Sequence, residues 1–317
     1  MPRAAVLDDY QEVAREMTDW GSLPAGVSVD FFADHLSADD DVARRLAPYE
    51  IVVAMRERTP FQRTLFSRLP NLKLLVTTGM RNASIDMAAA AEHGVTVCGT
   101  DGLPYPTAEL TWALILALVR KVPTEDAATR AGQWQVTMGE GLRGKTLGVI
   151  GLGRLGSQVG TIGAAFGMNL LAWSQNLTAE RAAEFGARLV SKEELLSESD
   201  IVTIHLVLSG RTRGLVGESE LSLMKRSAYL VNTSRGPIVD EIALIGALES
   251  RAIAGAGLDV FDIEPLPLDH KLRSLPNTVL TPHMGYVTAE TYRIFYRDAV
   301  EDIAAFLLGK PVRVISA

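Results

Sequence analysis

An arginine, a glutamate and a histidine in the last third of the chain have side chains that could together bind an anion and transfer a proton. Arg235 lies within Asn-Thr-Ser-Arg-Gly-Pro, Glu264 within Phe-Asp-Ile-Glu-Pro, and His283 within Thr-Pro-His-Met-Gly. A guanidinium can bind a substrate carboxylate through two parallel hydrogen bonds. An imidazolium can protonate the alkoxide that forms when hydride reaches the carbonyl carbon, and a carboxylate bonded to its other nitrogen favours the protonated ring. We therefore interpret Arg235 as substrate-binding, His283 as the acid/base and Glu264 as its partner.

These three residues are far apart in sequence, so strands must bring them together. Each follows an apolar run that predicts a strand, over 228–232, 255–260 and 278–281. In open parallel sheets, ligands bind outside the carboxyl ends of the strands. Taken singly, His283 could be a structural histidine, Arg235 a surface arginine and Glu264 a turn acid. Their shared position at strand ends favours a catalytic interpretation.

A glycine-rich turn predicts a dinucleotide site. A strand predicted over 146–150 runs into Gly-Leu-Gly-Arg-Leu-Gly at 151–156, and a helix is predicted over 155–166. The first glycine permits a tight turn, the second a close approach of the backbone to pyrophosphate, and the third close packing of helix on sheet. The helix N-terminus offers free N–H groups to the phosphates. The predicted cofactor-binding residues here are Gly151, Gly153, Arg154, Leu155 and Gly156.

The strand predicted over 169–173 ends where an NAD-binding protein commonly carries an acidic residue for the ribose. Here the chain has Ser174, Gln175 and Asn176. Without an acid, repulsion of a 2′-phosphate is absent, and Ser174 and Asn176 can donate hydrogen bonds to phosphate. We predict that these three residues bind the cofactor, which is NAD or NADP, and the pattern favours NADP.

Two series of strands and helices indicate two α/β units. The first has strands at 4–7, 27–32, 51–55, 72–78 and 95–98, with helical segments at 11–17, 39–46, 61–69 and 86–93. The second begins at Lys145 and has strands at 146–150, 169–173, 200–205, 228–232, 255–260 and 278–281, with a further helical segment at 241–250. Alternation of this kind predicts right-handed crossovers and parallel sheets. A last helix, over 289–308, follows the second series, so the second unit is expected to be inserted into the first.

A strongly apolar helix is predicted between the two series. It covers 109–121, with Thr107 as its cap and Pro123 just beyond its end, and a glycine-rich stretch follows at 132–144. A helix that is apolar on nearly every face is buried, and we expect this one to lie between domains or subunits.

Composition excludes several classes of protein. The 317 residues include 31 Lys+Arg and 38 Asp+Glu, for a net charge of −7, and one cysteine, Cys98. An acidic chain without a basic cluster is a poor ligand for nucleic acid or anionic lipid, so we expect no nucleic-acid or membrane partner. The lone Cys98 and five scattered histidines predict neither disulfides nor a metal site. We expect a cytoplasmic protein.

Three motifs resemble those of the D-isomer-specific 2-hydroxyacid dehydrogenase family, in particular its glyoxylate and hydroxypyruvate reductases. Arg-Gly-x-x-Val-Asp matches residues 235–240, Gly-x-Asp-Val-Phe-x-x-Glu-Pro matches 257–265, and Pro-His-x-Gly matches 282–285. The resemblance covers nearly the whole chain. It implies a Rossmann-type doubly wound parallel sheet, over 102–288, inserted into a smaller flavodoxin-like α/β substrate domain made of 1–101 and 289–317. It also implies a small 2-keto or D-2-hydroxy acid as substrate, and a homodimer in which Trp134 packs across the interface.

The resemblance also assigns roles to further residues. Asp259 is expected at the nicotinamide amide, with Thr107 and Thr233 lining that site and Gly285 beside it. His205, Leu206 and Thr212 match the family's loop beneath the adenine. Because His205 ends an apolar strand, we interpret it as a backbone contact or core residue rather than a second acid. The family binds the substrate carboxylate with a backbone loop, here residues 79–82. The predicted substrate-binding residues of that loop are Gly79, Met80 and Arg81.

The chain departs from the family pattern at three places. Met80-Arg81 stands where a second glycine is usual, Val207 where proline is common, and Ser174 where an acid is usual. The run Arg56-Glu57-Arg58 is interpreted as either pocket lining or a solvated loop. We expect hinges near 101–106 and 284–289 to close on the substrate. Two alternatives stay open: a dinucleotide-sensing binding protein on the same fold, and, less favoured because it needs no proton transfer, a formate-type dehydrogenase.

Overall fold

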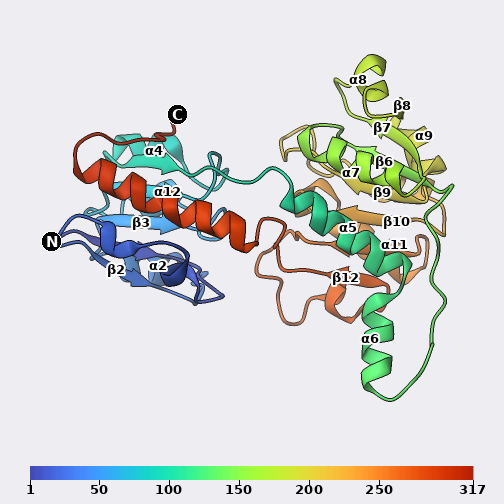
Figure 1. The fold of residues 1–317 in the computed structure, drawn as a ribbon, viewed down its shortest axis with the longest axis horizontal. Coiled ribbons are helices and arrows are strands. Elements are labelled where there is room, and N and C mark those ends of the chain that lie inside the picture. The colour runs from blue at the N-terminus through green and yellow to red at the C-terminus, as the bar shows by residue number, and fades with distance from the viewer. Residues whose placement is uncertain (317) are drawn as a thin grey trace. The chain divides into compact units, whose positions relative to one another are not determined.

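The computed structural model describes residues 1–316, which divide into two compact α/β units (Figure 1). The split unit consists of Met1–Leu103 and the chain from Val287 onward, and the inserted unit is Pro104–Tyr286. The chain passes from the split unit to the inserted unit after Leu103 and returns after Tyr286. Each unit contains one parallel sheet.

The split unit has a five-stranded sheet in the order β2-β1-β3-β4-β5. This is the flavodoxin-like order, in which successive strands are added toward one edge up to β2 and toward the other edge from β3 onward. Its strands are β1 (Arg3–Val6), β2 (Ser28–Phe31), β3 (Ile51–Ala54), β4 (Leu74–Thr77) and β5 (Thr96–Gly99). Its helices are α1 (Ala14–Met17), α2 (Asp39–Leu46), α3 (Arg63–Phe66), α4 (Met87–Glu92) and the long α12 (Ala289–Leu307), which packs against α1 and β4. Every residue of β3 and β4 is buried, as expected for a parallel sheet covered on both faces.

The inserted unit has a seven-stranded sheet in the order β12-β11-β10-β9-β6-β7-β8. The first strand of this sheet, β6, lies in its interior. Strands β7 and β8 follow toward one edge, and β9 to β12 follow toward the other, which is the doubly wound Rossmann arrangement. Its strands are β6 (Thr146–Ile150), β7 (Asn169–Trp173), β8 (Ala187–Leu189), β9 (Ile201–Ile204), β10 (Tyr229–Asn232), β11 (Gly255–Leu258) and β12 (Thr278–Leu280). Its helices are α5 (Pro106–Val119), α6 (Val122–Arg130), α7 (Arg154–Ala165), α8 (Ala179–Ala183), α9 (Lys192–Glu198), α10 (Glu218–Leu223) and α11 (Glu241–Glu249).

Apolar cores lie on the two faces of the inserted sheet. Helices α5 and α7 cover one face, where Trp112 packs its ring 4.8 Å from that of Phe166 and donates from Nε1 to the Val159 carbonyl. The other face carries a second buried cluster, which includes Leu195, Leu221 and Leu244 from α9, α10 and α11. The predicted burial of the apolar helix is confirmed for most of its side chains. Among residues 1–316, none of the helices has the length and apolar character needed to cross a membrane.

The predicted fold class is confirmed, and each predicted strand overlaps a strand of the structure. Three local expectations were wrong or incomplete. Strand β8 was not predicted. The apolar helix ends before Pro123, as expected, but Pro123 lies in the first turn of α6, a helix that was not predicted. Thr107 does not cap α5, because the helix begins at Pro106 and its N-cap is Tyr105.

Candidate active site

His283 and Glu264 are paired at the carboxyl edge of the inserted sheet. His283 Nδ1 lies 2.6 Å from Glu264 Oε2, and the Phe261 N–H donates to Glu264 Oε1 at 2.9 Å. His283 has a φ of +50°, a left-handed conformation that side chains other than glycine rarely adopt. Its N–H donates to the Asp259 carbonyl at 2.7 Å, which helps hold this strained backbone. With Nδ1 bonded to the Glu264 carboxylate, Nε2 is the other nitrogen at which the ring can exchange a proton.

The Asp259 carboxylate anchors the segment that carries His283. Its Oδ1 accepts hydrogen bonds from Thr281 Oγ1 at 2.6 Å and the Met284 N–H at 2.8 Å, and its Oδ2 accepts from the Gly285 N–H at 3.0 Å. Burial raises the pKa of the Asp259 carboxyl, and the hydrogen bonds from Thr281 and the two N–H groups act in the opposite direction. The contact of Asp259 with nicotinamide stays a prediction, and the structure adds an internal role for the same side chain.

The Arg235 segment follows β10 and packs directly on the chain beside Glu264. Asn232 shapes the turn, since its side chain accepts from the Ser234 N–H and donates to the Arg235 carbonyl, both at 3.0 Å. A Cβ on Gly236 would lie 2.1 Å from the Phe261 carbonyl carbon, so only glycine allows this approach. The structure thus brings the segments of Arg235, Glu264 and His283 to the ends of three adjacent strands, β10, β11 and β12.

The glycine-rich turn has the geometry of a dinucleotide cradle. Gly151 has a φ of +97°, and a Cβ there would lie 2.7 Å from the His205 carbonyl oxygen. A Cβ on Gly156 would lie 2.0 Å from the Gly151 oxygen, so the helix packs tightly against the turn. In contrast, a Cβ on Gly153 would meet nothing within 4 Å and would project into open space at the start of α7. Helix α7 has no side-chain cap, so its first N–H groups are available to phosphate oxygens. The residues present therefore fit a bound dinucleotide.

A chain of threonine hydroxyls joins several predicted cofactor residues. Thr107 Oγ1 donates to the Gly285 carbonyl at 3.1 Å, Thr111 Oγ1 donates to the Thr107 carbonyl at 2.8 Å, and the Thr111 and Thr233 hydroxyls are 2.8 Å apart. A Cβ on Gly285 would lie 3.1 Å from Thr107 Oγ1 and 3.3 Å from Asp259 Oδ2. Sequence reasoning missed Thr111, although its spacing of four residues from Thr107 on one helix was a usable signal.

The remaining predicted cofactor residues follow β7 and β9. Ser174, Gln175 and Asn176 form the turn directly after β7, with Gln175 and Asn176 exposed. His205 Nε2 lies 2.9 Å from Thr203 Oγ1, and burial lowers the pKa of His205 to about 4, so its ring is neutral at pH 7 and is not a second acid. Thr212 lies in the loop that follows Leu206. Its Oγ1 donates to the Val207 carbonyl at 2.7 Å, which stabilises this loop.

In the split unit, Arg56 lies against the predicted substrate loop. Its Nη1 donates to the Thr78 carbonyl at 3.0 Å, and a Cβ on Gly79 would collide with the same nitrogen at 1.8 Å. The Gly79 N–H donates to Thr100 Oγ1 at 2.8 Å, so it is already used. Among the described residues, the N–H groups of Met80 and Arg81 have no protein acceptor, and both side chains are exposed.

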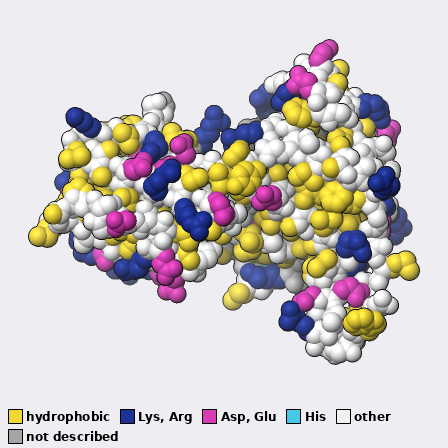
Figure 2. All heavy atoms as spheres, viewed as in Figure 1, with side chains coloured by type: hydrophobic (Ala, Val, Ile, Leu, Met, Phe, Trp, Pro, Cys, Tyr) yellow, Lys and Arg dark blue, Asp and Glu magenta, His cyan; other side chains and the backbone are white. Residues whose placement is uncertain are grey.

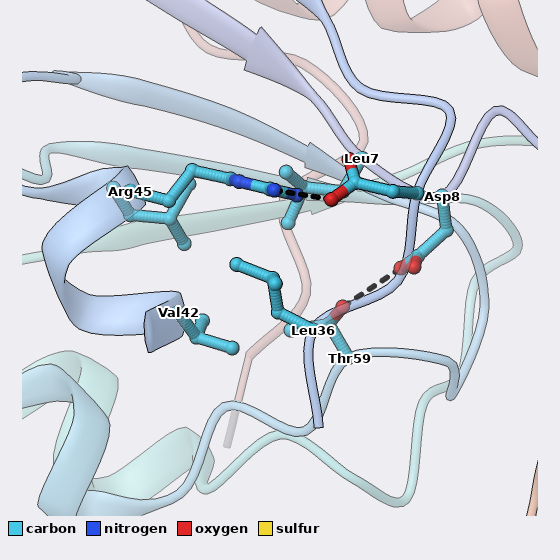
Figure 3. Close-up of a pocket in the computed structure, with 8 residues that line it drawn as sticks. Leu7, Asp8, Leu36, Val42, Arg45 and Thr59 are labelled. Atoms are coloured by element: carbon cyan, nitrogen blue, oxygen red, sulfur yellow. Dashed lines mark hydrogen bonds and ion pairs between the residues drawn. The ribbon is translucent and has the colours of Figure 1, made fainter. Parts of the chain in front are cut away.

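The split unit has a pocket that none of the predicted site residues lines (Figure 3). Its polar lining groups are already bonded: Thr59 Oγ1 donates to Asp8 Oδ2 at 2.7 Å, and Arg45 Nη2 lies 2.5 Å from Asp34 Oδ2. The pocket is lined by Leu7, Asp8, Asp34, Leu36, Val42, Arg45, Leu46 and Thr59. We assign it no ligand.

Comparison with known proteins decides the family. Residues 112–285 match the family model described as D-isomer specific 2-hydroxyacid dehydrogenase, NAD binding domain. The chain belongs to this family. It is 45% identical over 256 residues to the glyoxylate reductase of Aeropyrum pernix, across 78% of this chain and 76% of that protein. It is 38% identical over 261 residues to the D-3-phosphoglycerate dehydrogenase of Bacillus subtilis, across 81% of this chain but only 50% of that enzyme, so it spans about half of that relative's length.

A solved structure supports the same assignment. The phosphoglycerate oxidoreductase of Vibrio cholerae O395 has a TM-score of 0.93 and 37% identity, with 98% of this chain and 100% of that chain covered. The resemblance in the sequence motifs is thereby confirmed. The chain is an oxidoreductase of a family that uses a nicotinamide dinucleotide and acts on 2-hydroxyacids. These findings do not favour the alternative of a dinucleotide-sensing binding protein.

Proposed function

We propose that this protein transfers hydride between NAD(P)H and a small 2-keto acid, forming a D-2-hydroxy acid, with His283 as acid/base. The observation that carries the proposal is the 2.6 Å contact between His283 Nδ1 and Glu264 Oε2 at the carboxyl edge of the dinucleotide-binding sheet. A carboxylate at this distance fixes the ring orientation and stabilises the protonated imidazole. His283 therefore holds a proton at Nε2 for the developing alkoxide.

A dinucleotide held by the turn at 151–156 and the N-terminus of α7 would supply hydride for the carbonyl carbon. Arg235 binds the substrate carboxylate through its guanidinium fork and orients the carbonyl toward His283. Glu264 keeps the imidazolium charged until the proton leaves Nε2. Asp259 holds the backbone around His283. Its carboxylate accepts from the Met284 N–H and its carbonyl accepts from the His283 N–H, so the imidazole ring stays in place during proton transfer.

The split unit contributes the substrate loop in this proposal. Gly79, Met80 and Arg81 remain the proposed substrate-binding residues, and the open N–H groups of Met80 and Arg81 suit a carboxylate oxygen. Arg56 is added to this set because its guanidinium lies on Gly79. We propose that 1–101 and 289–317 act as the substrate domain and 102–288 as the cofactor domain. The glyoxylate reductases among the relatives favour a short 2-keto acid, such as glyoxylate or hydroxypyruvate.

For the cofactor, we propose a preference for NADP. The turn after β7 carries Ser174, Gln175 and Asn176, and no carboxylate among them would repel a 2′-phosphate. The hydroxyl of Ser174 and the amides of its neighbours can donate hydrogen bonds to phosphate oxygens.

We further propose a cytoplasmic homodimer. Trp134, Val136 and Met138 follow α6, and their side chains are 79%, 46% and 89% exposed. Hydrophobic side chains also reach the surface over α5 and beside α6 in Figure 2, which supports burial of this region against a second copy. The cytoplasmic assignment rests on the single, buried Cys98, which forms no disulfide among the described residues.

The test of the proposed function is turnover of a keto-acid panel. The purified protein is mixed with NADPH or NADH, and loss of the reduced cofactor is followed with glyoxylate, hydroxypyruvate, pyruvate and phenylpyruvate. We expect reduction of at least one short acid, and a D-configured product from the chiral ones by chiral chromatography. If the protein binds the dinucleotide but reduces no member of the panel, or forms an L-product, the proposal is wrong.

A further inference from the structure

A second carboxylate–imidazole pair braces the loop that carries Glu264. Glu241, the first residue of α11, places Oε1 3.0 Å from His270 Nε2. Its other oxygen, Oε2, accepts from the Asp262 N–H at 3.4 Å. The Glu241 and His270 side chains are 19% and 18% exposed, so solvent weakens this pair only in part. One carboxylate thus reaches both ends of the segment from Asp262 to His270.

The loop has little else to fix it. Residues 259–270 contain no helix or strand, and Ile263 and Leu268 leave 64% and 91% of their surface exposed. Glu264 lies in the exposed part of this loop, so apolar packing cannot hold its carboxylate in place. Beyond the Asp259 bonds, the ties of the loop include the Phe261 N–H to Glu264, the His270 N–H to the carbonyl of residue 267, and bonds from the Arg273 guanidinium to the carbonyls of residues 266 and 267. Leu266 packs against the buried cluster, whereas residues 262–265 are exposed.

Charged groups of both signs surround Asp262, whose N–H donates to Glu241. Burial raises the pKa of Asp262, and the neighbouring carboxylates of Glu241 and Asp240 raise it further, while Arg213 and His270 act in the opposite direction. The Leu272 N–H donates to His270 Nδ1 at 3.3 Å, which assigns the proton of the neutral ring to Nε2, the nitrogen that faces Glu241.

Glu241 also links the loop to the Arg235 segment. The chain from Arg235 to Glu241 passes through a short 3-10 turn at Gly236–Ile238, where Gly236 touches the backbone of Phe261. A shift of the Glu264 loop would therefore change its distance from the substrate-binding arginine as well as from His283.

We propose that Glu241 and His270 are positioning residues that hold Glu264 against His283. This inference rests on the proposed function. A carboxylate is required at residue 241 because both of its partners are donors. A glutamine there could accept from only one of them and would present its own N–H₂ group to the other.

The test is a double-mutant cycle on reductive turnover by the full-length protein. Glu241→Gln is expected to lower kcat about 10- to 100-fold with little change in the KM for NAD(P)H, because displacement of a catalytic partner by about 1 Å has effects of this size. His270→Gln, which can still donate to Glu241, should retain more activity than His270→Ala.

Glu264→Gln and the double variant Glu241→Gln/Glu264→Gln complete the cycle. If Glu241 acts through Glu264, the double variant should be no slower than Glu264→Gln alone. Glu198→Gln is the matched control, because Glu198 pairs with Arg188 of β8, at the opposite edge of the sheet from β12. Independent, additive losses or an unaffected Glu241→Gln enzyme would overturn the inference. An unaffected Glu264→Gln enzyme would instead refute the proposed function.

Discussion

Replacement of Glu264 by glutamine removes the charge beside His283 and preserves the size of the side chain. The variant can still accept from the Phe261 N–H, so the loop keeps its local tie. A hydrogen bond to a charged partner contributes about 1.5–3 kcal/mol, which corresponds to about 10- to 150-fold in rate. The His283 and Glu264 side chains are 20% and 33% exposed, so partial solvation moves the expected loss toward the lower end. We expect reductive kcat at pH 7 to fall about 10- to 50-fold.

The assay is steady-state oxidation of NAD(P)H with the best keto acid, repeated from pH 5 to 9. The dissociation constant for NAD(P)H, measured by fluorescence, should be unchanged. Asp269→Asn is the matched control, since it removes an exposed carboxylate of the same loop. Equal rates for wild type and Glu264→Gln across the pH range would refute the reasoning.

Three further predictions concern substrate, cofactor and stability. Arg235→Ala should raise the KM for the keto acid far more than the KM for NAD(P)H, and equal KM values in steady-state assays would remove Arg235 from the substrate site. Ser174→Asp should shift kcat/KM from NADPH toward NADH through repulsion of the 2′-phosphate, and an unchanged ratio would contradict the cofactor proposal. Burial raises the pKa of Asp302 to about 7, so the folded state takes up a proton more readily than the unfolded state. Its contribution to stability is therefore present at low pH and is lost as the pH rises toward 7. The free energy of unfolding of Asp302→Asn, from denaturant titrations, should fall less between pH 5 and 8 than that of wild type, and parallel profiles would exclude this role.

The elements that position the site could be predicted because their signals are local. Apolar runs such as 51–54 and 201–204 are buried strands, and the turn at 151–156 combines strand, glycines and helix in one short segment. Such local patterns do not predict very short strands. Strand β8 has three residues, Ala187–Leu189, and is held at the sheet edge by pairing with β7.

Interactions between distant loops left no local signal. The left-handed backbone of His283 depends on a bond to Asp259, and the pairing of Glu241 with His270 joins two segments that the sequence separates by a strand. Sequence reasoning assigned His270 no role because only the folded loop brings it to Glu241. The predicted role of Thr107 as the cap of α5 was wrong for a related reason. Proline at the first helical position already begins α5, and the Thr107 hydroxyl bonds to the Gly285 carbonyl instead.

The most direct test of the central claim compares wild type with His283→Ala in keto-acid reduction. Both proteins are titrated with NAD(P)H by fluorescence and then assayed at saturating cofactor with the acid that wild type reduces best. The account predicts a fall in kcat of about 10²- to 10⁴-fold with an unchanged dissociation constant for the cofactor. Turnover by His283→Ala at the wild-type rate would show that another group supplies the proton and would contradict the account.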